Sequence, residues 1–375
     1  MIYLDYSANT PVDEAVLKRF CAVERSCPGN ANSRHQAGAA AKTAIDEATQ
    51  SIARSLNVQP AEIVYTSGAS EANNFALKSI ARLERHHGKH IISTPLEHSS
   101  VSGTLTALQE QGYEIDLVDI KQDGTVDLAH LRELLRPDTI LVAVTAVDSE
   151  LGVVQPVAEI TALLKDYPHC HLHVDATQAV GKLPLPSFEG IDTLSLTAHK
   201  FYGLNGIGVL VKRRGLALEP LIHGGESTTI YRSGTPTVAL ACSLALALDK
   251  AMTELPERVE RVRSLNVRLR TELAKYPKVR INSPEAAVPQ ILNLSVKDVK
   301  GTVFQRELDA HGVCVSVKSA CSSDGLPSRA VFAVSRDRRN ALSSWRISLS
   351  HRTTDEEITG FLQAFDACYR TLTQP

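Results

Sequence analysis

The chain has 375 residues, more than one hydrophobic core ordinarily organises, so two or three domains are expected. Its 40 Lys and Arg residues nearly balance 42 Asp and Glu residues, and the net charge of −2 excludes a general nucleic-acid or membrane-surface binder. Hydrophobic residues make up 43% of the sequence, yet the longest nearly apolar run, residues 238–248, is too short to span a bilayer.

Two features predict a cytoplasmic protein. The N-terminus has neither the basic start nor the apolar stretch of a secretory signal peptide. The seven cysteines are odd in number and none forms a CxxC pair, which favours free thiols over a disulfide framework or a structural zinc site. We therefore expect a reducing compartment.

Strand-like and helix-like segments alternate through the first two thirds of the chain. Strands are predicted at residues 62–66, 90–93, 114–119, 139–144, 171–174, 193–197 and 207–211. Helices are predicted at residues 71–85, 100–111, 128–135, 157–165 and 238–253. Such alternation predicts an α/β domain with a largely parallel sheet, which we assign to residues 13–253.

The pattern changes beyond residue 253. Helices are predicted at residues 257–276 and 354–372, with β-like runs at residues 290–296 and 313–317 between them. We expect a smaller α+β domain that combines residues 254–375 with residues 1–12.

A lysine lies where one predicted strand ends. Ala198, His199 and Lys200 lead from the strand at residues 193–197 into a glycine-rich turn. A lysine among apolar and glycine residues is desolvated, and its amine then becomes nucleophilic near neutral pH. An isolated lysine is more often only a surface residue. The glycines form neither a GxGxxG fingerprint nor a P-loop, so they do not indicate a dinucleotide or ATP site.

An aspartate, Asp175, ends the preceding strand. Open α/β sheets build their ligand sites at the carboxyl ends of strands. An aspartate there with Lys200 nearby is the pair that pyridoxal phosphate chemistry requires, because the lysine forms a Schiff base and the aspartate keeps the pyridinium nitrogen protonated. The alternative for Asp175 is a helix cap.

Histidines alternate along the same segment, at His169, His171 and His173. This spacing resembles a set of metal ligands. No HExxH or CxxC motif accompanies them, however, so ordinary packing is favoured and no metal site is predicted.

Two segments of small polar residues are candidate phosphate sites. Residues 66–71 run from a strand into a helix, whose first N–H groups attract an anion. Residues 232–235 offer an arginine and two hydroxyls. Each signal is weak alone, because many helices begin with a similar cap.

Cys321 lies among serines and glycine in residues 318–325, a composition that predicts an exposed, mobile loop. A thiol three residues from Lys318 is expected to be reactive. The other six cysteines mostly occur in apolar-periodic contexts, which favours packing roles.

In their order along the chain, these segments resemble the cysteine desulfurases, within the class V aminotransferase branch of fold-type I pyridoxal phosphate enzymes. The resemblance extends over almost the whole sequence. The matching runs are YLDYSANTP at 3–11, TSGASE at 66–71, EH at 97–98, ELGVVQ at 150–155, HVDATQ at 173–178, AHK at 198–200, RSGT at 232–235, SACSS at 319–323 and RISLS at 346–350.

The resemblance implies a homodimeric pyridoxal phosphate enzyme with a large, mostly parallel seven-stranded sheet. It implies that Lys200 forms the Schiff base, Asp175 pairs with the ring nitrogen, and His98 stacks on the ring and moves protons. Cys321, in the small domain, would take sulfur from the substrate as a persulfide.

The resemblance also implies the remaining contacts. Gln178 and Ser149 would reach the cofactor's O3′, and Asn9, Ser149 and Arg346 would bind the substrate, since a guanidinium suits a carboxylate. The implied phosphate ligands are Ala69, Ser70, Thr197, His199 and, from the neighbouring subunit, Thr235.

Two departures from the family pattern stand out. The family's two asparagines before Glu-Ile-Gly are replaced by Asp148 and Ser149, and Lys318 replaces a glycine. These changes bear on rate, substrate and sulfur acceptor rather than on fold or cofactor.

The implied reaction converts L-cysteine to L-alanine and passes the sulfur from Cys321 to an acceptor or iron–sulfur scaffold protein. Selenocysteine lyase, cysteine lyase and another class V aminotransferase-type reaction remain open alternatives. A weakly active scaffold homologue is disfavoured, because the residues for catalysis are intact: Lys200, Asp175, His98, Arg346 and Cys321.

Overall fold

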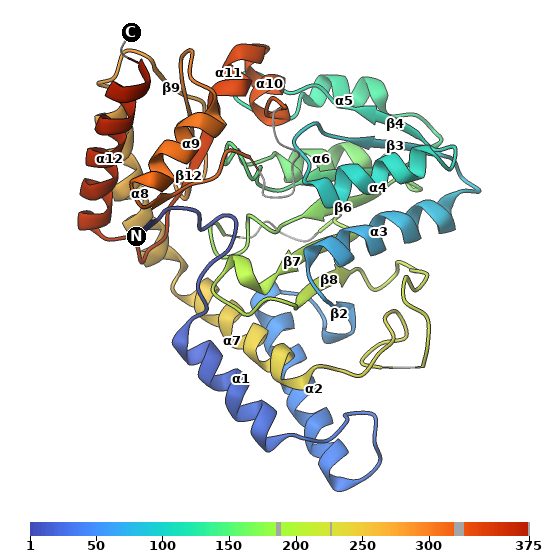
Figure 1. The fold of residues 1–375 in the computed structure, drawn as a ribbon. Coiled ribbons are helices and arrows are strands. Elements are labelled where there is room, and N and C mark those ends of the chain that lie inside the picture. Colours follow the sequence, from blue (N-terminus) through green and yellow to red (C-terminus); the bar gives the residue numbers. More distant parts are fainter. Residues whose placement is uncertain (185–188, 226, 319–325, 374–375) are drawn as a thin grey trace.

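A seven-stranded sheet forms the centre of the molecule (Figure 1). The computed structural model describes residues 1–184, 189–225, 227–318 and 326–373. Across the sheet the order is β2 (Ile63–Thr66), β8 (Gly208–Lys212), β7 (Thr193–Thr197), β6 (His171–Asp175), β5 (Thr139–Thr145), β3 (His90–Ser93) and β4 (Glu114–Leu117). Strand β8 runs antiparallel to both of its neighbours, β2 and β7, and all the other neighbouring pairs in this sheet are parallel. The predicted α/β class with a mostly parallel sheet is confirmed.

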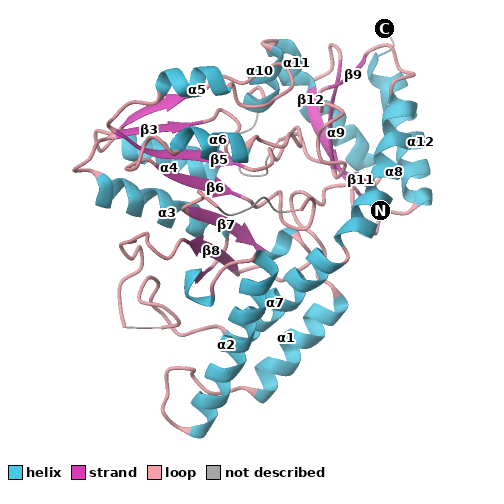
Figure 2. Cartoon of the chain, turned by 180° about the vertical axis from the view of Figure 1, so that it is seen from behind, coloured by secondary structure: helices cyan, strands magenta, loops and turns pink. Residues whose placement is uncertain are grey.

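Helices cover both faces of this sheet (Figure 2). They are α3 (Ala69–Glu84), α4 (Ser99–Gln109), α5 (Leu128–Leu134), α6 (Val157–Leu164) and α7 (Val238–Thr253). Every residue of β5 is buried, and its side chains alternate between the two faces. Leu141 and Ala143 join the core beneath α3 and α4, whereas Val142 and Val144 join the core that includes α6 and α7.

The sequence analysis missed α1 (Glu14–Ser26) and α2 (Gln36–Leu56), which pack with α7 and extend away from the sheet (Figure 1). Helix α1 buries only Val16 and Val23. Helix α2 buries mostly alanines and isoleucines among polar residues. In α2 the buried positions recur every three or four residues, at 38, 41, 45, 48, 52 and 56, so the sequence does carry a helical period here that the prediction did not use.

The C-terminal part has a second sheet and its own core. Its elements are α8 (Leu255–Leu273), β9 (Val279–Ile281), β10 (Ile291–Val296), α9 (Gly301–Ala310), β11 (Val313–Cys314), α10 (Arg329–Ser335), α11 (Arg338–Ser343), β12 (Ser344–Ser348) and α12 (Asp355–Thr373). Strands β12, β10 and β9 form an antiparallel sheet in that order. Aromatic side chains fill the core beside this sheet, and the rings of Phe304 and Trp345 stack with their centroids 5.2 Å apart.

The N-terminal strand β1 (Ile2–Tyr3) pairs with β11, far from its neighbours in sequence. The strand predicted at residues 313–317 ends early, because Ser316 turns to bridge Arg346 of β12. Val288 and Ile291 pack into the core of the large sheet, so the two parts share a hydrophobic contact. The division into residues 13–253 and residues 1–12 with 254–375 stays a prediction, which the pairing of β1 supports.

Within the described ranges, every helix is too short or too polar to traverse a lipid bilayer.

Candidate active site

The carboxyl ends of the parallel strands border a cavity of about 370 Å³. This position agrees with the general rule for ligand sites in open α/β sheets. Most residues proposed from the sequence line the cavity: Ala69, Ser70, His98, Ser149, Asp175, Gln178, Thr197, His199, Lys200 and Arg346. The fold therefore brings together side chains from both parts of the chain.

Three predicted site residues do not line this cavity. Asn9 is exposed and donates to the Thr10 carbonyl at 3.3 Å, while the preceding Ser7 and Ala8 line the cavity instead. Thr235 borders a smaller cavity of about 80 Å³ that shares Ser67 and Gly206 with the first. Cys321 lies outside the described residues.

The ends of the segment that carries Cys321 are joined to each other. Lys318, which stands where the family has glycine, donates from Nζ to the Leu326 carbonyl at 3.0 Å. The substitution therefore adds a contact across the two ends of this segment.

Lys200 ends the short 3₁₀ helix η2 (Ala198–Lys200), which directly follows β7. Its Nζ donates to the carbonyl oxygens of Ser7 and Ala8 at 2.8 and 2.7 Å. The N-terminal segment therefore orients the amine at the cavity. The sequence did not indicate this contact, because the carbonyls are almost 200 residues away.

Asp175 ends β6 and is 4% exposed. One carboxylate oxygen accepts from the Thr177 N–H at 2.9 Å, and the other accepts from Asn73 Nδ2 at 2.8 Å. A turn rather than a helix follows in the described residues 176–184. Asp175 is thus not a helix cap, and two donors hold its carboxylate at the edge of the cavity.

Asn73 was missed by the sequence analysis. It is fully buried in α3, where its Nδ2 also donates to Ser100 Oγ at 2.9 Å. Its Oδ1 accepts from Ser195 Oγ and lies 3.0 Å from His173 Nε2. The amide orientation is therefore determined by donors on one side and acceptors on the other. The signal that could have indicated Asn73 is an asparagine on the otherwise largely apolar buried face of a helix.

His98 immediately precedes α4. The backbone N–H of Ser100 donates to His98 Nδ1 at 3.1 Å, so a neutral His98 ring carries its proton on Nε2. Burial lowers the pKa of His98 by more than the charge of Asp175 raises it, and the charge of Lys200 adds a smaller lowering effect. His98 is therefore neutral at neutral pH.

The opposite end of the cavity suits an anion. The start of α3 points its first N–H groups here, and Gly68 supplies no capping side chain to occupy them. Burial, followed by the charges of Lys200 and Lys182, lowers the pKa of His199 to about 4. Nδ1 of the neutral His199 lies 3.2 Å from Thr197 Oγ1. Both side chains lie at this end of the cavity, where they offer hydrogen bonds to an anion.

Gly208 makes this approach of β8 to α3 possible. A Cβ at this position would lie 2.6 Å from the Leu196 carbonyl oxygen and 2.7 Å from the Cα of Gly68. No side chain fits such a space, so any substitution would displace the start of α3.

Arg346 on β12 is buried at the other side of the cavity, with 1% of its surface exposed. It donates from Nη1 to the Ser149 carbonyl at 2.7 Å and forms an ion pair from Nη2 with Asp5 at 2.8 Å. Among the described residues its Nε has no partner. The contact with Asp5 connects the first residues of the chain to the site.

Gln178 is oriented by a buried lysine that the sequence analysis did not single out. Lys182 Nζ donates to Gln178 Oε1 at 2.6 Å, and Gln178 Nε2 donates to the Ser7 carbonyl at 2.9 Å. Burial, then the charges of Lys200 and Arg346, lowers the pKa of Lys182 to about 7. This chain of contacts ends at the same carbonyl that holds Lys200.

Asp148, which replaces a family asparagine, shapes a turn and does not line the cavity. Its carboxylate accepts from the N–H groups of Glu150, at 3.2 Å, and Leu151. Burial, followed by the charge of Glu150, raises the pKa of Asp148 to about 7.

Asp148→Asn is expected to stabilise the protein, and more so at high pH. Between its ordinary value of 3.8 and about 7, the unfolded chain loses the Asp148 proton while the folded chain keeps it, so stability falls as pH rises. Asparagine does not titrate, and at pH 8 the gain is on the order of 2–4 kcal/mol. Thermal unfolding of the wild type and the variant at pH 5 and pH 8 measures it. Asp166→Asn, at an exposed aspartate, is the control. An equal effect at both pH values would contradict the prediction.

The comparisons with known proteins agree with this geometry. The aminotransferase class-V model matches residues 2–361, and the chain belongs to this family, whose members are pyridoxal phosphate enzymes. The predicted fold type is therefore confirmed.

The similar proteins are more specific. A cysteine desulfurase IscS of Dictyoglomus turgidum is 36% identical over 97% of this chain and 93% of its own length. A cysteine desulfurase IscS of Proteus mirabilis is 41% identical over 95% and 90% of the two chains. Among solved structures, a NifS-like protein superposes with a TM-score of 0.93 at 33% identity, covering 99% and 100% of the two chains.

Proposed function

We propose that this protein is a pyridoxal phosphate-dependent cysteine desulfurase, which converts L-cysteine to L-alanine and holds the sulfur as a persulfide on Cys321. The observation that carries the proposal is the convergence of Lys200, Asp175 and His98 on one cavity. The desulfurases similar over nearly the full length support the choice of reaction.

The residues of the cavity fit pyridoxal phosphate. Asp175 offers a buried carboxylate for the ring nitrogen, and the start of α3 offers N–H groups for the phosphate. Ala69, Ser70, Thr197 and His199 surround that phosphate end, while Gln178 and Ser149 are the candidates for O3′. When bound, the cofactor supplies an electron sink that weakens the bonds at the substrate's α-carbon.

The remaining residues act on the substrate. Arg346 and Ser149 bind its carboxylate, and the amine of Lys200 takes the α-proton. His98 would hold the ring of the bound cofactor and, with its proton on Nε2, would exchange protons there. The Cys321 thiolate then attacks the substrate sulfur, so that an S–S bond forms as the C–S bond breaks. The electrons of that C–S bond stay with the carbon skeleton, which leaves as alanine after protonation. The proposed contribution of Asn9 to substrate binding has no counterpart in the cavity lining.

Incubation of the purified holoenzyme with L-cysteine tests the function. Equal amounts of alanine and protein-bound persulfide are expected in a single turnover. Release of pyruvate, or conversion of an added 2-oxo acid to an amino acid, would instead indicate a lyase or a transaminase. A faster reaction with L-selenocysteine than with L-cysteine would indicate a selenocysteine lyase.

Asn73→Ala is expected to lower kcat by about tenfold or more, because Asp175 loses one of its two donors. The pH dependence of the cofactor's visible absorption should shift as well, since Asp175 is less well held. Asn74→Ala is the matched control, at a neighbour that donates to the Ser70 carbonyl at 3.0 Å. An Asn73→Ala protein with unchanged kcat and pH profile would show that Asn73 has no positioning role.

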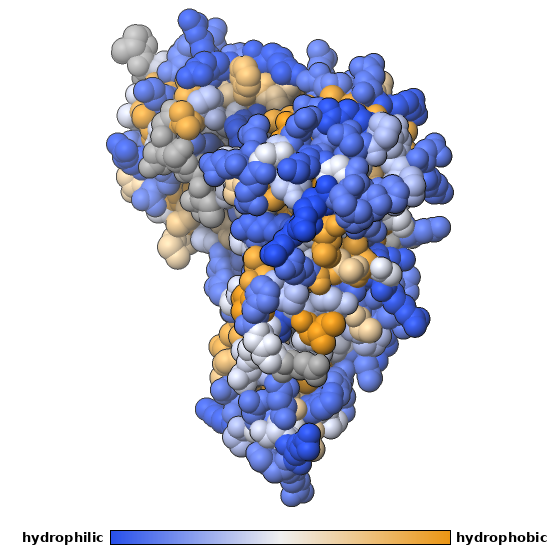
Figure 3. Space-filling model, turned by 90° about the vertical axis from the view of Figure 1, so that its right-hand side faces the viewer, coloured by the Kyte–Doolittle hydropathy of each residue, from blue (hydrophilic) through white to orange (hydrophobic). Residues whose placement is uncertain are grey.

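We further propose a homodimer in which Thr235 reaches the phosphate of the neighbouring subunit. Thr235 is exposed and lies beside the cavity rather than in it. The same segment between β8 and α7 exposes Leu221, Ile222 and Ile230, the last at 64%. Apolar side chains also gather near the middle of the face seen in Figure 3. Exposed apolar surface of this kind supports an interface between subunits.

The dimer predicts complementation between two inactive chains. A heterodimer of Lys200→Ala and Thr235→Ala chains contains one site with both residues intact, so about half of the wild-type activity per dimer should return. Two separable affinity tags isolate the heterodimer, and the Lys200→Ala homodimer is the control. Verified heterodimers without activity would argue against a shared site.

The sulfur acceptor is proposed to be a protein, such as a thiol carrier or an iron–sulfur scaffold. A cytoplasmic location and the absence of nucleic-acid and membrane partners stay predictions from the sequence.

A further inference from the structure

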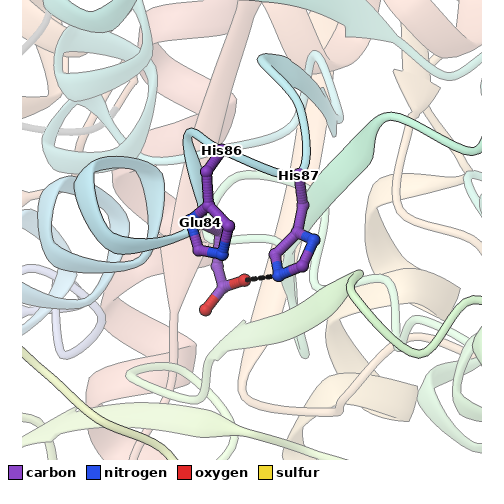
Figure 4. A group of neighbouring side chains, drawn as sticks. All are labelled: Glu84, His86 and His87. Atoms are coloured by element: carbon purple, nitrogen blue, oxygen red, sulfur yellow. Dashed lines mark ion pairs between the residues drawn. The ribbon is translucent and has the colours of Figure 1, made fainter.

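Three side chains with metal-binding groups converge at the end of α3 that is opposite to the candidate active site. Glu84 is the last residue of α3, and His86 and His87 lie in the turn that follows. One ligand atom from each residue lies within 4.8 Å of the others. Figure 4 shows the three side chains directed to the same side of the turn.

The spacing of these groups suits an ion better than a hydrogen bond. Glu84 Oε2 lies 3.7 Å from His87 Nε2. A hydrogen bond would require about 2.7–3.2 Å. In a tetrahedral zinc site with bonds of about 2.0–2.1 Å, two ligand atoms lie about 3.4 Å apart. The carboxylate and the imidazole therefore need only a small shift to bind one ion.

Neighbouring groups orient the ligands. His86 Nδ1 lies 2.9 Å from the Leu83 carbonyl, which only accepts, so Nδ1 carries the proton and Nε2 presents a lone pair. Metal-binding histidines usually make such a contact. Glu84 Oε1 faces His171 Nε2 at 3.6 Å, and His171 Nδ1 faces Asp192 at 3.3 Å. This second chain of contacts directs the other oxygen of Glu84 toward the two histidines.

The surroundings also favour a cation. The carboxyl end of a helix carries a partial negative charge. The nearby Arg82 is paired with Glu219 at 2.8 Å, and the basic side chain that does face Glu84, His171, lies against Oε1 rather than against Oε2. His169 stacks on His87 with ring centroids 3.7 Å apart, which restricts the His87 ring.

We propose that Glu84, His86 and His87 bind one divalent transition-metal ion, with a fourth position open to water. Imidazole and carboxylate ligands suit Zn²⁺. The site differs from the alternating set His169, His171 and His173, for which the sequence predicted ordinary packing, and His173 contacts Asn73. His171 and Asp175 begin and end β6, about 13 Å apart. The ion would thus bind at the end of α3, next to the start of β6 and away from the reacting groups, and it does not depend on the proposed activity.

Calorimetric titration with Zn²⁺ tests the site. The protein is the holoenzyme carrying Cys321→Ser, which removes a thiol that would capture the ion, and it is freed of metal with a chelator and dialysed. Cysteine and alanine are left out because they bind metals. The parent is expected to bind one Zn²⁺ per chain. In the double variant His86→Ala/His87→Ala the dissociation constant should be at least about 100-fold higher. His311→Ala is the control, since His311 forms a comparable exposed pair with Glu307 at 3.9 Å.

Thermal unfolding provides a second measurement. Zn²⁺ should raise the Tm of the parent by a few degrees and that of Glu84→Gln by much less, each compared with the same protein without metal. Unchanged zinc affinity in the double variant would overturn the proposal. So would an equal loss of affinity in His311→Ala, or no binding by the parent at millimolar Zn²⁺.

Discussion

Lys200→Ala is expected to abolish both the covalent attachment of pyridoxal phosphate and the turnover of L-cysteine. Among the described residues, Lys200 is the lysine that lines the cavity, and two carbonyl oxygens direct its amine there. Since one residue supplies both the attachment and the base, kcat should fall by about 10³-fold or more. The cofactor's visible absorption and the alanine released per chain measure the two effects.

A second buried lysine makes the test specific. Lys182 also has a lowered pKa, of about 7, and so is a chemically reasonable rival. It does not line the cavity, because its Nζ is bonded to Gln178. Reduction of the holoenzyme with borohydride, followed by peptide mapping, should find the pyridoxyl group on Lys200. A label on Lys182 would refute the assignment and leave the fold untouched.

Cys321→Ala is expected to separate binding from sulfur transfer. The thiol has no part in holding the cofactor or in removing the α-proton, so the variant should still bind L-cysteine with the wild-type spectral change. It should release almost no alanine and carry no persulfide, because no nucleophile accepts the sulfur. Single-turnover assays with mass spectrometry of the intact protein measure both outcomes.

The control for this variant is Cys314→Ser, at a partly buried cysteine of β11. It should keep most of the activity. A transaminase or an eliminating lyase would not need the Cys321 thiol. Turnover of L-cysteine by Cys321→Ala at the wild-type rate would therefore rule out the persulfide mechanism. Residual turnover of L-selenocysteine alone would agree with it, since selenium leaves more readily than sulfur.

Much of the large sheet was predictable because most of its strands are short segments with apolar residues at all or at alternate positions. The strands at residues 90–93 and 193–197 and the helix at residues 238–253 have the predicted limits. Asp175 and Lys200 could be singled out for the same reason, since Asp175 ends a buried strand and Lys200 closely follows one. Parallel strands align their carboxyl ends, so residues at those ends meet whatever separates them in sequence.

Only the tertiary structure decided which groups hold these residues. Asn73 contacts Asp175 across 102 positions, and Arg346 contacts Asp5 across 341. Neither contact leaves a periodic trace, because hydrogen-bond partners are selected by distance in the folded chain and not along the sequence. Glu84, His86 and His87 lie within four consecutive residues, yet the orientation of Glu84 depends on His171 and Asp192, which reach it only through the packing of α3 on the sheet.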